Sequence, residues 1–349
     1  MGNFLSLDIP VFQGGMGVGV SLGGLAGAVA AQGGAGTIST AQIGFREEDF
    51  EQNPLKANLR AIGKEVEKAR KIAQGKGAIG VNIMHVTHDY AEYVKEAVKQ
   101  KVDFIVSGAG LPMELPALTK GSSVKIIPVV SSLKAISVIC RRWMKKDEKL
   151  PDAVLIEGPE AGGHLGFTAE AAGTIGKEEF QEEIKRIISY VREFGAEHGR
   201  KIPVIVAGGI HKYKDACEQF DLGADFIQLG TRFVTTEECD ASLAYKQAYI
   251  NCKREDIQII KSPVGMPGRA LANPFIRQAG EHRIPPKKCY HCISVCKPKE
   301  TPYCITSALI RAVTGDVEHG LIFCGANAWK EEKIRTVKEV IDEVLGRTE

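Results

Sequence analysis

The residues best suited to chemistry surround His164, which lies in the run Ala161-Gly162-Gly163-His164-Leu165-Gly166. The three glycines carry no Cβ atoms, so a flat or anionic ligand can approach this backbone closely. An imidazole titrates near neutral pH and can give or take a proton there. We predict that this run is a ligand-binding loop with His164 as its catalytic residue. A tight turn that contains an incidental histidine is the alternative.

Four cysteines near the carboxyl terminus form a second candidate site, at Cys289, Cys292, Cys296 and Cys304. Their spacing, Cys-x2-Cys-x3-Cys-x7-Cys, concentrates four thiols within 16 residues. Such an array suits a tetrahedral zinc ion or an iron–sulfur cluster. The spacing matches a zinc ribbon and the common ferredoxin run only in part. Reduced cysteines that pack as small apolar side chains are the alternative.

The elements that must position these residues alternate between short apolar runs and amphipathic stretches. Strands are predicted over residues 9–13, 35–39, 78–83, 104–107, 125–130, 153–157, 203–207 and 226–229. Helices are predicted over residues 22–32, 59–73, 90–99, 113–119, 134–145, 177–197, 212–222 and 239–251. Because continuously apolar strands separated by helices indicate a parallel sheet, eight such units over about 250 residues predict a closed (β/α)8 TIM barrel of the α/β class. An open doubly wound sheet is the alternative.

The predicted barrel brings the loops that follow its strands together, because active sites in this fold lie at the carboxyl ends of the strands. Gly208 and Gly209 follow the seventh strand, and Gly230 and Thr231 follow the eighth. Bare backbone N–H groups at this place commonly hold a phosphate group. We therefore predict a phosphate site there, with Thr231 as a side-chain donor. Ordinary glycine turns are the alternative.

Beyond the barrel, which we assign to residues 1–255, residues 256–349 form a carboxyl-terminal extension that contains the four cysteines. Residues 262–270 are rich in turn formers and are predicted to fold back over the barrel mouth as a lid. Arg269 would then meet an anionic group of the substrate or cofactor, an ordinary surface connection being the alternative. Helices are predicted over residues 304–313 and 330–345.

Composition limits the classes of partner. Lys and Arg number 45 and Asp and Glu number 43, which gives a net charge of +2. So small a net charge does not indicate electrostatic attraction to nucleic acid or to an anionic membrane. The apolar runs are shorter than the roughly 20 residues of a membrane span, and we recognise no secretion signal. Nine cysteines, an odd number, indicate a reducing compartment. We expect a cytoplasmic enzyme that acts on a small molecule, and a homodimer is compatible with the sequence.

Five spaced motifs carry a resemblance to a known family. They are Phe12-Gln13-Gly14-Gly15-Met16-Gly17, Gly80-Val81-Asn82, Glu160-Ala161-Gly162-Gly163-His164-Leu165-Gly166, Ala207-Gly208-Gly209-Ile210 and Gln228-Leu229-Gly230-Thr231-Arg232-Phe233. With these motifs in order over roughly residues 8–275, the chain resembles the nitronate monooxygenase family, formerly called 2-nitropropane dioxygenases. That family also contains the FMN-dependent enoyl-acyl carrier protein reductases of the second type.

The resemblance implies that FMN lies in the mouth of the barrel and that His164 is the catalytic histidine. The FMN phosphate is expected at Gly208, Gly209, Gly230 and Thr231. The other expected cofactor contacts are Gly14, Gly15, Met16, Asn82, Ser107, Glu157 and Gly163.

Two reactions fit this resemblance. In the first, NAD(P)H reduces the flavin, which then delivers hydride to the activated C=C bond of an enone or enoyl thioester. In the second, a nitronate reduces the flavin and oxygen reoxidises it. Oxidation-prone thiols or an iron–sulfur site favour the first, an ene-reductase. A non-enzymatic flavin- or nucleotide-binding regulator and a colourless isomerase of sugar phosphates are further alternatives.

Overall fold

The computed structural model describes residues 4–347, in which eight parallel strands close into a barrel in the order β1-β2-β3-β4-β5-β6-β8-β9. The strands are β1 (Val11–Gln13), β2 (Ala35–Ser39), β3 (Ala78–Met84), β4 (Phe104–Gly108), β5 (Lys125–Val130), β6 (Val154–Glu157), β8 (Val204–Ala207) and β9 (Phe226–Leu229). Phe12 of β1 lies opposite both Ala35 of β2 and Gln228 of β9, so the barrel sheet has no free edge. The predicted TIM barrel is confirmed.

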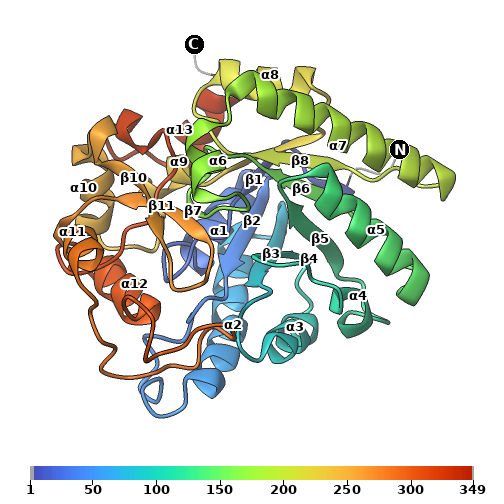
Figure 1. Ribbon diagram of the computed structural model, residues 1–349. Coiled ribbons are helices and arrows are strands. Elements are labelled where there is room, and N and C mark those ends of the chain that lie inside the picture. The colour runs from blue at the N-terminus through green and yellow to red at the C-terminus, as the bar shows by residue number, and fades with distance from the viewer. Residues whose placement is uncertain (1–3, 348–349) are drawn as a thin grey trace.

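Helices surround the barrel in the order that the sequence predicts (Figure 1). They are α1 (Gly23–Ala31), α2 (Pro54–Ala73), α3 (Tyr90–Lys99), α4 (Leu115–Leu118), α5 (Leu133–Asp147), α7 (Lys177–Glu197) and α8 (Tyr213–Asp221). Helix α2 begins five residues before the predicted start, because the Asn53 side chain accepts a hydrogen bond from the Lys56 N–H and Pro54 occupies the first turn. In residues 4–347, every helix is too short or too polar to cross a membrane.

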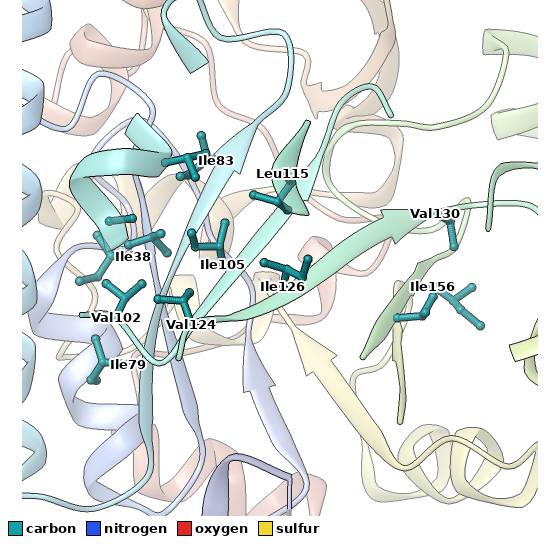
Figure 2. Close-up of a cluster of buried hydrophobic side chains, with 14 of the residues drawn as sticks. Ile38, Ile79, Ile83, Val102, Ile105, Leu115, Val124, Ile126, Val130 and Ile156 are labelled. Atoms are coloured by element: carbon teal, nitrogen blue, oxygen red, sulfur yellow. The ribbon is translucent and has the colours of Figure 1, made fainter. Parts of the chain in front are cut away.

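The apolar core has two layers, one on each face of the barrel sheet. Inside the barrel, the Phe12 ring meets the rings of Phe104 and Phe226 edge-on, each at a centroid distance of 5.5 Å. Outside it, branched side chains such as Ile83 and Ile105 lie between the strands and the helices (Figure 2). Because both faces of each strand are buried, the strands are apolar throughout instead of alternating.

The end of the chain returns to the barrel wall. Helix α13 (Val337–Val344) packs against α1, α8 and the short helix α9 (Thr231–Val234), and shares an apolar cluster with Leu25 and Ile227. It begins later than predicted, where Thr336 and Glu339 form a capping box. The helix predicted after β9 begins at Leu243 as α10 (Leu243–Asn251) and packs against α12 (Ile305–Thr314) and the 3-10 turn η3 (Ala328–Lys330). One apolar cluster around α10 therefore includes residues from both sides of position 255, such as Tyr245 and Leu271.

A three-stranded antiparallel sheet lies beside the barrel and contains the His164 loop. Its strands are β10 (Ile257–Lys261), β11 (Pro267–Leu271) and β7 (Gly163–His164), in the order β10-β11-β7 (Figure 1). His164 pairs with Gly268, and Gly163 pairs with Arg269. The predicted turn-rich lid is thus a hairpin, which holds the backbone on both sides of the histidine.

The remaining elements connect these parts. They are the helices α6 (Ala169–Thr174) and α11 (Pro274–Glu281) and the 3-10 turns η1 (Phe4–Ser6) and η2 (Arg254–Asp256).

Candidate active site

A cavity of about 260 Å³ lies where the loops that follow the barrel strands meet the carboxyl-terminal extension. The structure brings most of the predicted cofactor contacts to its wall. These are Gly14, Gly15, Met16, Asn82, Glu157, Gly163, Gly208, Gly209, Gly230 and Thr231, and His164 lines the same cavity. The extension adds an apolar wall from Val264, Ile293, Ile305, Leu309 and Phe323.

Ser107 is the predicted cofactor contact that the structure places elsewhere. Its hydroxyl donates to the Ile83 carbonyl at 2.9 Å and lies 2.9 Å from the Tyr90 hydroxyl of α3. Side chains alternate across a strand, and Phe104 and Val106 of β4 fill the barrel interior, so Ser107 faces the helices. The Ser107 side chain therefore does not line the cavity, and its contact with the cofactor stays a prediction.

One end of the cavity consists largely of backbone, and we call it the phosphate end. Gly208 and Gly209 have φ angles of 102° and 78°, a region that favours glycine. A Cβ atom added at Gly230 would meet only the Met16 sulfur, at 3.7 Å, so the space in front of this backbone is open. An open, glycine-walled end of this kind fits a phosphate group that is held by backbone N–H groups.

Arg232 and His211 are two side chains at the phosphate end that sequence analysis missed. Both line the cavity, and their exposed fractions are 2% and 7%. Arg232 Nη1 lies 3.0 Å from Glu331 Oε2, and Nη2 contacts Glu343. Among the described residues, neither Arg232 Nε nor His211 Nδ1 has a hydrogen-bond partner. Arg232 belongs to a motif that the sequence displays, but nothing in the sequence links it to Glu331.

Glu331 is a buried carboxylate that balances the positive charge of Arg232. It accepts a hydrogen bond from Thr235 Oγ1 at 3.0 Å, and His211 Nε2 lies 3.1 Å from its Oε1. Burial alone would raise the pKa of Glu331, but the contact with His211 and the charge of Arg232 outweigh burial and lower that pKa. Glu331 is therefore ionised and paired.

Another part of the cavity wall contains His164, and we call it the histidine end. His164 Nε2 lies 2.7 Å from Ser262 Oγ, in the turn between β10 and β11, and the Phe323 ring packs edge-on at a centroid distance of 4.9 Å. Loss of hydration lowers the pKa of His164 to about 4. The imidazole is therefore neutral near pH 7.

Glu157 ends β6 and lines the same cavity. Burial raises the pKa of its carboxyl to about 7. The cavity therefore contains a neutral imidazole and a carboxyl that titrates near neutral pH, two groups that can hold or move a proton.

Arg269 does not meet an anionic ligand, contrary to the expectation from the sequence. Its Nη1 donates to the carbonyl oxygens of Pro159 and Ala161, at 2.6 Å each, and its Nη2 donates to that of Ala172 at 3.3 Å. The side chain is buried and is absent from the cavity wall. Arg269 instead ties the hairpin to the loop that precedes His164.

The predicted metal site is not assembled in the structure. Within residues 4–347, no group of three or more His, Cys, Asp or Glu side chains is placed to hold a metal ion. Cys289 is exposed, whereas Cys292 and Cys296 pack against the apolar cluster of the extension. Burial raises the pKa of Cys292 to about 11. Ile293, next to Cys292, forms a β-bridge with Thr87, which follows β3 at the barrel mouth.

Sequence comparisons identify relatives of this chain. A probable nitronate monooxygenase of Staphylococcus aureus (strain Newman) is 27% identical over 191 residues, which are 54% of this chain and 49% of the relative. The matched part thus spans about half the length of this relative. A probable nitronate monooxygenase of Staphylococcus aureus (strain JH9) is 24% identical over 298 residues, 80% of this chain and 79% of the relative.

Solved structures share the fold, and a family model covers nearly the whole chain. FabK from Thermotoga maritima superimposes with a TM-score of 0.75 at 28% identity, covering 98% of this chain and 93% of that one. A nitroalkane oxidase from Streptomyces ansochromogenes has the same fold, with a TM-score of 0.72 at 19% identity over 98% of this chain and 97% of its own. The model of the family described as nitronate monooxygenase matches residues 1–346. The chain therefore belongs to the nitronate monooxygenase family.

Proposed function

We propose that this protein is an FMN-dependent oxidoreductase that uses NAD(P)H to reduce an activated C=C bond, as in an enone or an enoyl thioester. The residues of the cavity fit FMN. The open space in front of Gly230 suits the phosphate, Gly208 and Gly209 line the same cavity, and Thr231 adds a hydroxyl. Met16 and Asn82 also line the cavity, and they would contact the ribityl chain or the isoalloxazine. A bound FMN would supply hydride transfer between the nicotinamide and the substrate.

The observation that carries the choice of substrate is the neutral, largely apolar histidine end. Among the described residues that line the cavity, Arg232 is the one lysine or arginine, and it belongs to the phosphate end. The pKa of His164 is lowered to about 4, so this imidazole carries no charge near pH 7. An uncharged alkene conjugated to a carbonyl group suits such surroundings better than an anionic nitronate does, because an unpaired anion loses hydration there.

His164 would supply the proton for this reduction. The Val264 N–H donates to Ser262 Oγ at 3.4 Å, which leaves the Ser262 hydroxyl free to donate to His164 Nε2. The neutral imidazole then carries its proton on Nδ1. When hydride adds to one alkene carbon, the other carbon would take the proton from Nδ1, while Nε2 would take the hydroxyl proton of Ser262, which regains a proton from water.

Nitronate monooxygenase is the second candidate function. It is favoured by the family description and by the names of the staphylococcal relatives. In that reaction, the negative charge of a bound nitronate would raise the pKa of His164 and protonate it, forming an ion pair.

Anaerobic mixing separates the two functions. Purified protein is mixed without oxygen with NADH, NADPH or an alkyl nitronate, and the visible absorption of the flavin is followed. We expect bleaching by a reduced nicotinamide, followed by anaerobic recovery of the absorption when an enone is added. Bleaching by the nitronate alone, with recovery only on admission of oxygen, would select the monooxygenase.

A further inference from the structure

The phosphate end is closed by residues 325–331, which follow the barrel strand β9 by about a hundred positions. The Gly325 N–H donates to Thr231 Oγ1 at 3.0 Å, and Asn327 Nδ2 donates to the Gly209 carbonyl at 2.7 Å. One short segment therefore holds both loops that are assigned to the phosphate. A Cβ atom at position 325 would lie 2.6 Å from Thr231 Oγ1, so this close approach requires glycine.

The hydrogen bond from Gly325 also sets the direction of the Thr231 hydroxyl. Because Thr231 Oγ1 accepts from the backbone, its own proton remains available to a different acceptor. Thr231, Gly325 and Asn327 all line the cavity. The segment thus leaves a hydroxyl donor at the place where a phosphate oxygen would lie.

A buried ion-pair group locks the same segment to the barrel. Glu331, which is 1% exposed, pairs with Arg232 at 3.0 Å. This pairing uses only the terminal nitrogens of Arg232, and its buried Nε has no partner among the described residues. Buried donors without partners are costly, and the unpartnered Nδ1 of His211 adds a second such atom in the cavity wall.

We propose that residues 325–331 are part of the phosphate pocket, so that a phosphorylated flavin and the docked carboxyl-terminal segment stabilise each other. This inference rests on the proposed use of FMN and extends it to residues outside the family motifs seen in the sequence. It assigns Gly325 and Asn327 as positioning residues, which act through Thr231 and Gly209. The segment selects FMN over riboflavin, which has the same ring system and side chain without the phosphate.

The test compares the binding of these two flavins to the full-length chain, after removal of bound cofactor, by quenching of flavin fluorescence. For Asn327→Ala we expect the Kd for FMN to rise about tenfold, the scale of one lost hydrogen bond. Gly325→Ala should weaken FMN at least as much, because the added methyl group displaces Thr231 Oγ1. The Kd for riboflavin should change less than about twofold in both variants. Asn251→Ala, at an exposed position of α10, is the matched control and should leave both constants unchanged.

Equal weakening of both flavins, or no weakening of FMN, overturns the proposal. If either variant does not fold, hydrogen exchange of the unaltered chain gives the answer: FMN should slow exchange of the amides in 325–331 and riboflavin should not. Identical protection by both flavins would also overturn it. A chain that binds neither flavin would instead contradict the proposed function itself.

Discussion

The two ends of the cavity are built by different physical means. At the phosphate end, open glycine backbone is backed by a buried group in which Arg232 is paired with Glu331 and Glu343. At the histidine end, apolar side chains surround one neutral imidazole, whose one side-chain hydrogen bond among residues 4–347 is to Ser262. The phosphate end thus holds charged side chains in fixed positions, whereas the histidine end keeps the reacting imidazole uncharged. We infer that anchoring of the cofactor and proton transfer are separate tasks, and that substitutions at each end should have different signatures.

The largest expected effect is on stability, at the phosphate end. Arg232→Met removes the partner of a buried carboxylate, Glu331, and should lower the free energy of unfolding by about 3–5 kcal/mol. Denaturant titration measures this change. Arg277→Met, at an exposed position on α11, is the control and should stay within about 0.5 kcal/mol of the unaltered protein. A loss below about 1 kcal/mol for Arg232→Met would mean that the ion pairs do not hold this end together.

The next effect is on turnover, at the histidine end. His164→Ala should retain flavin and lose turnover on the order of 10²-fold or more, because the proton donor is gone. The exposed His319, substituted in the same way, is the control. Turnover that survives in His164→Ala would remove this residue from the mechanism and erase the contrast between the two ends.

A smaller effect should follow from loss of the hydroxyl that orients His164. Ser262→Ala should lower kcat by roughly tenfold with little change in KM, because a hydrogen bond to the imidazole is lost while the cavity wall remains. Ser262→Thr keeps the hydroxyl and should restore most of the rate. Steady-state kinetics of the two variants test this prediction. If Ser262 only filled space, Ser262→Ala should retain more activity than Ser262→Thr.

The last effect is the pH dependence of stability, which is spread over a range of pH. The pKa of His164 falls from 6.5 to about 4 on folding, so the unfolded chain takes up a proton first as pH drops from 6.5 to 4, and stability is lost. The pKa of Glu157 rises from 4.5 to about 7, so the folded chain holds a proton between these values and stability is gained as pH drops. His164→Gln and Glu157→Gln should therefore change the pH slope of the unfolding free energy in opposite directions, each by up to about 3 kcal/mol across its window. Parallel slopes in the two variants would contradict these assignments.

The sequence predicts the barrel well because its strands are buried on both faces and read as continuous apolar runs. The limits predicted for β2, β5 and β9 agree with the structure. The loops after these strands then converge by topology, so the glycine positions of the phosphate end could be predicted as well. These features depend on local patterns and on the connection of neighbouring elements.

The features that the sequence did not predict depend on contacts between distant residues. β7 consists of only Gly163 and His164, and its pairing with β11 joins positions about a hundred residues apart. The contact between Arg232 and Glu331 is of the same kind. The orientation of Ser107 depends on which face of β4 points into the barrel, and that follows from the packing of Phe104 and Val106.

Identification of the chromophore of the purified protein tests the central claim most directly. The visible absorption spectrum is recorded, the protein is denatured, and the released compound is compared with FMN, FAD and riboflavin by chromatography. We predict a yellow protein that releases about one FMN per chain, because the phosphate end offers one site for a phosphate monoester and the histidine end faces the ring. A colourless protein that cannot be loaded with FMN would contradict the assignment of both ends of the cavity.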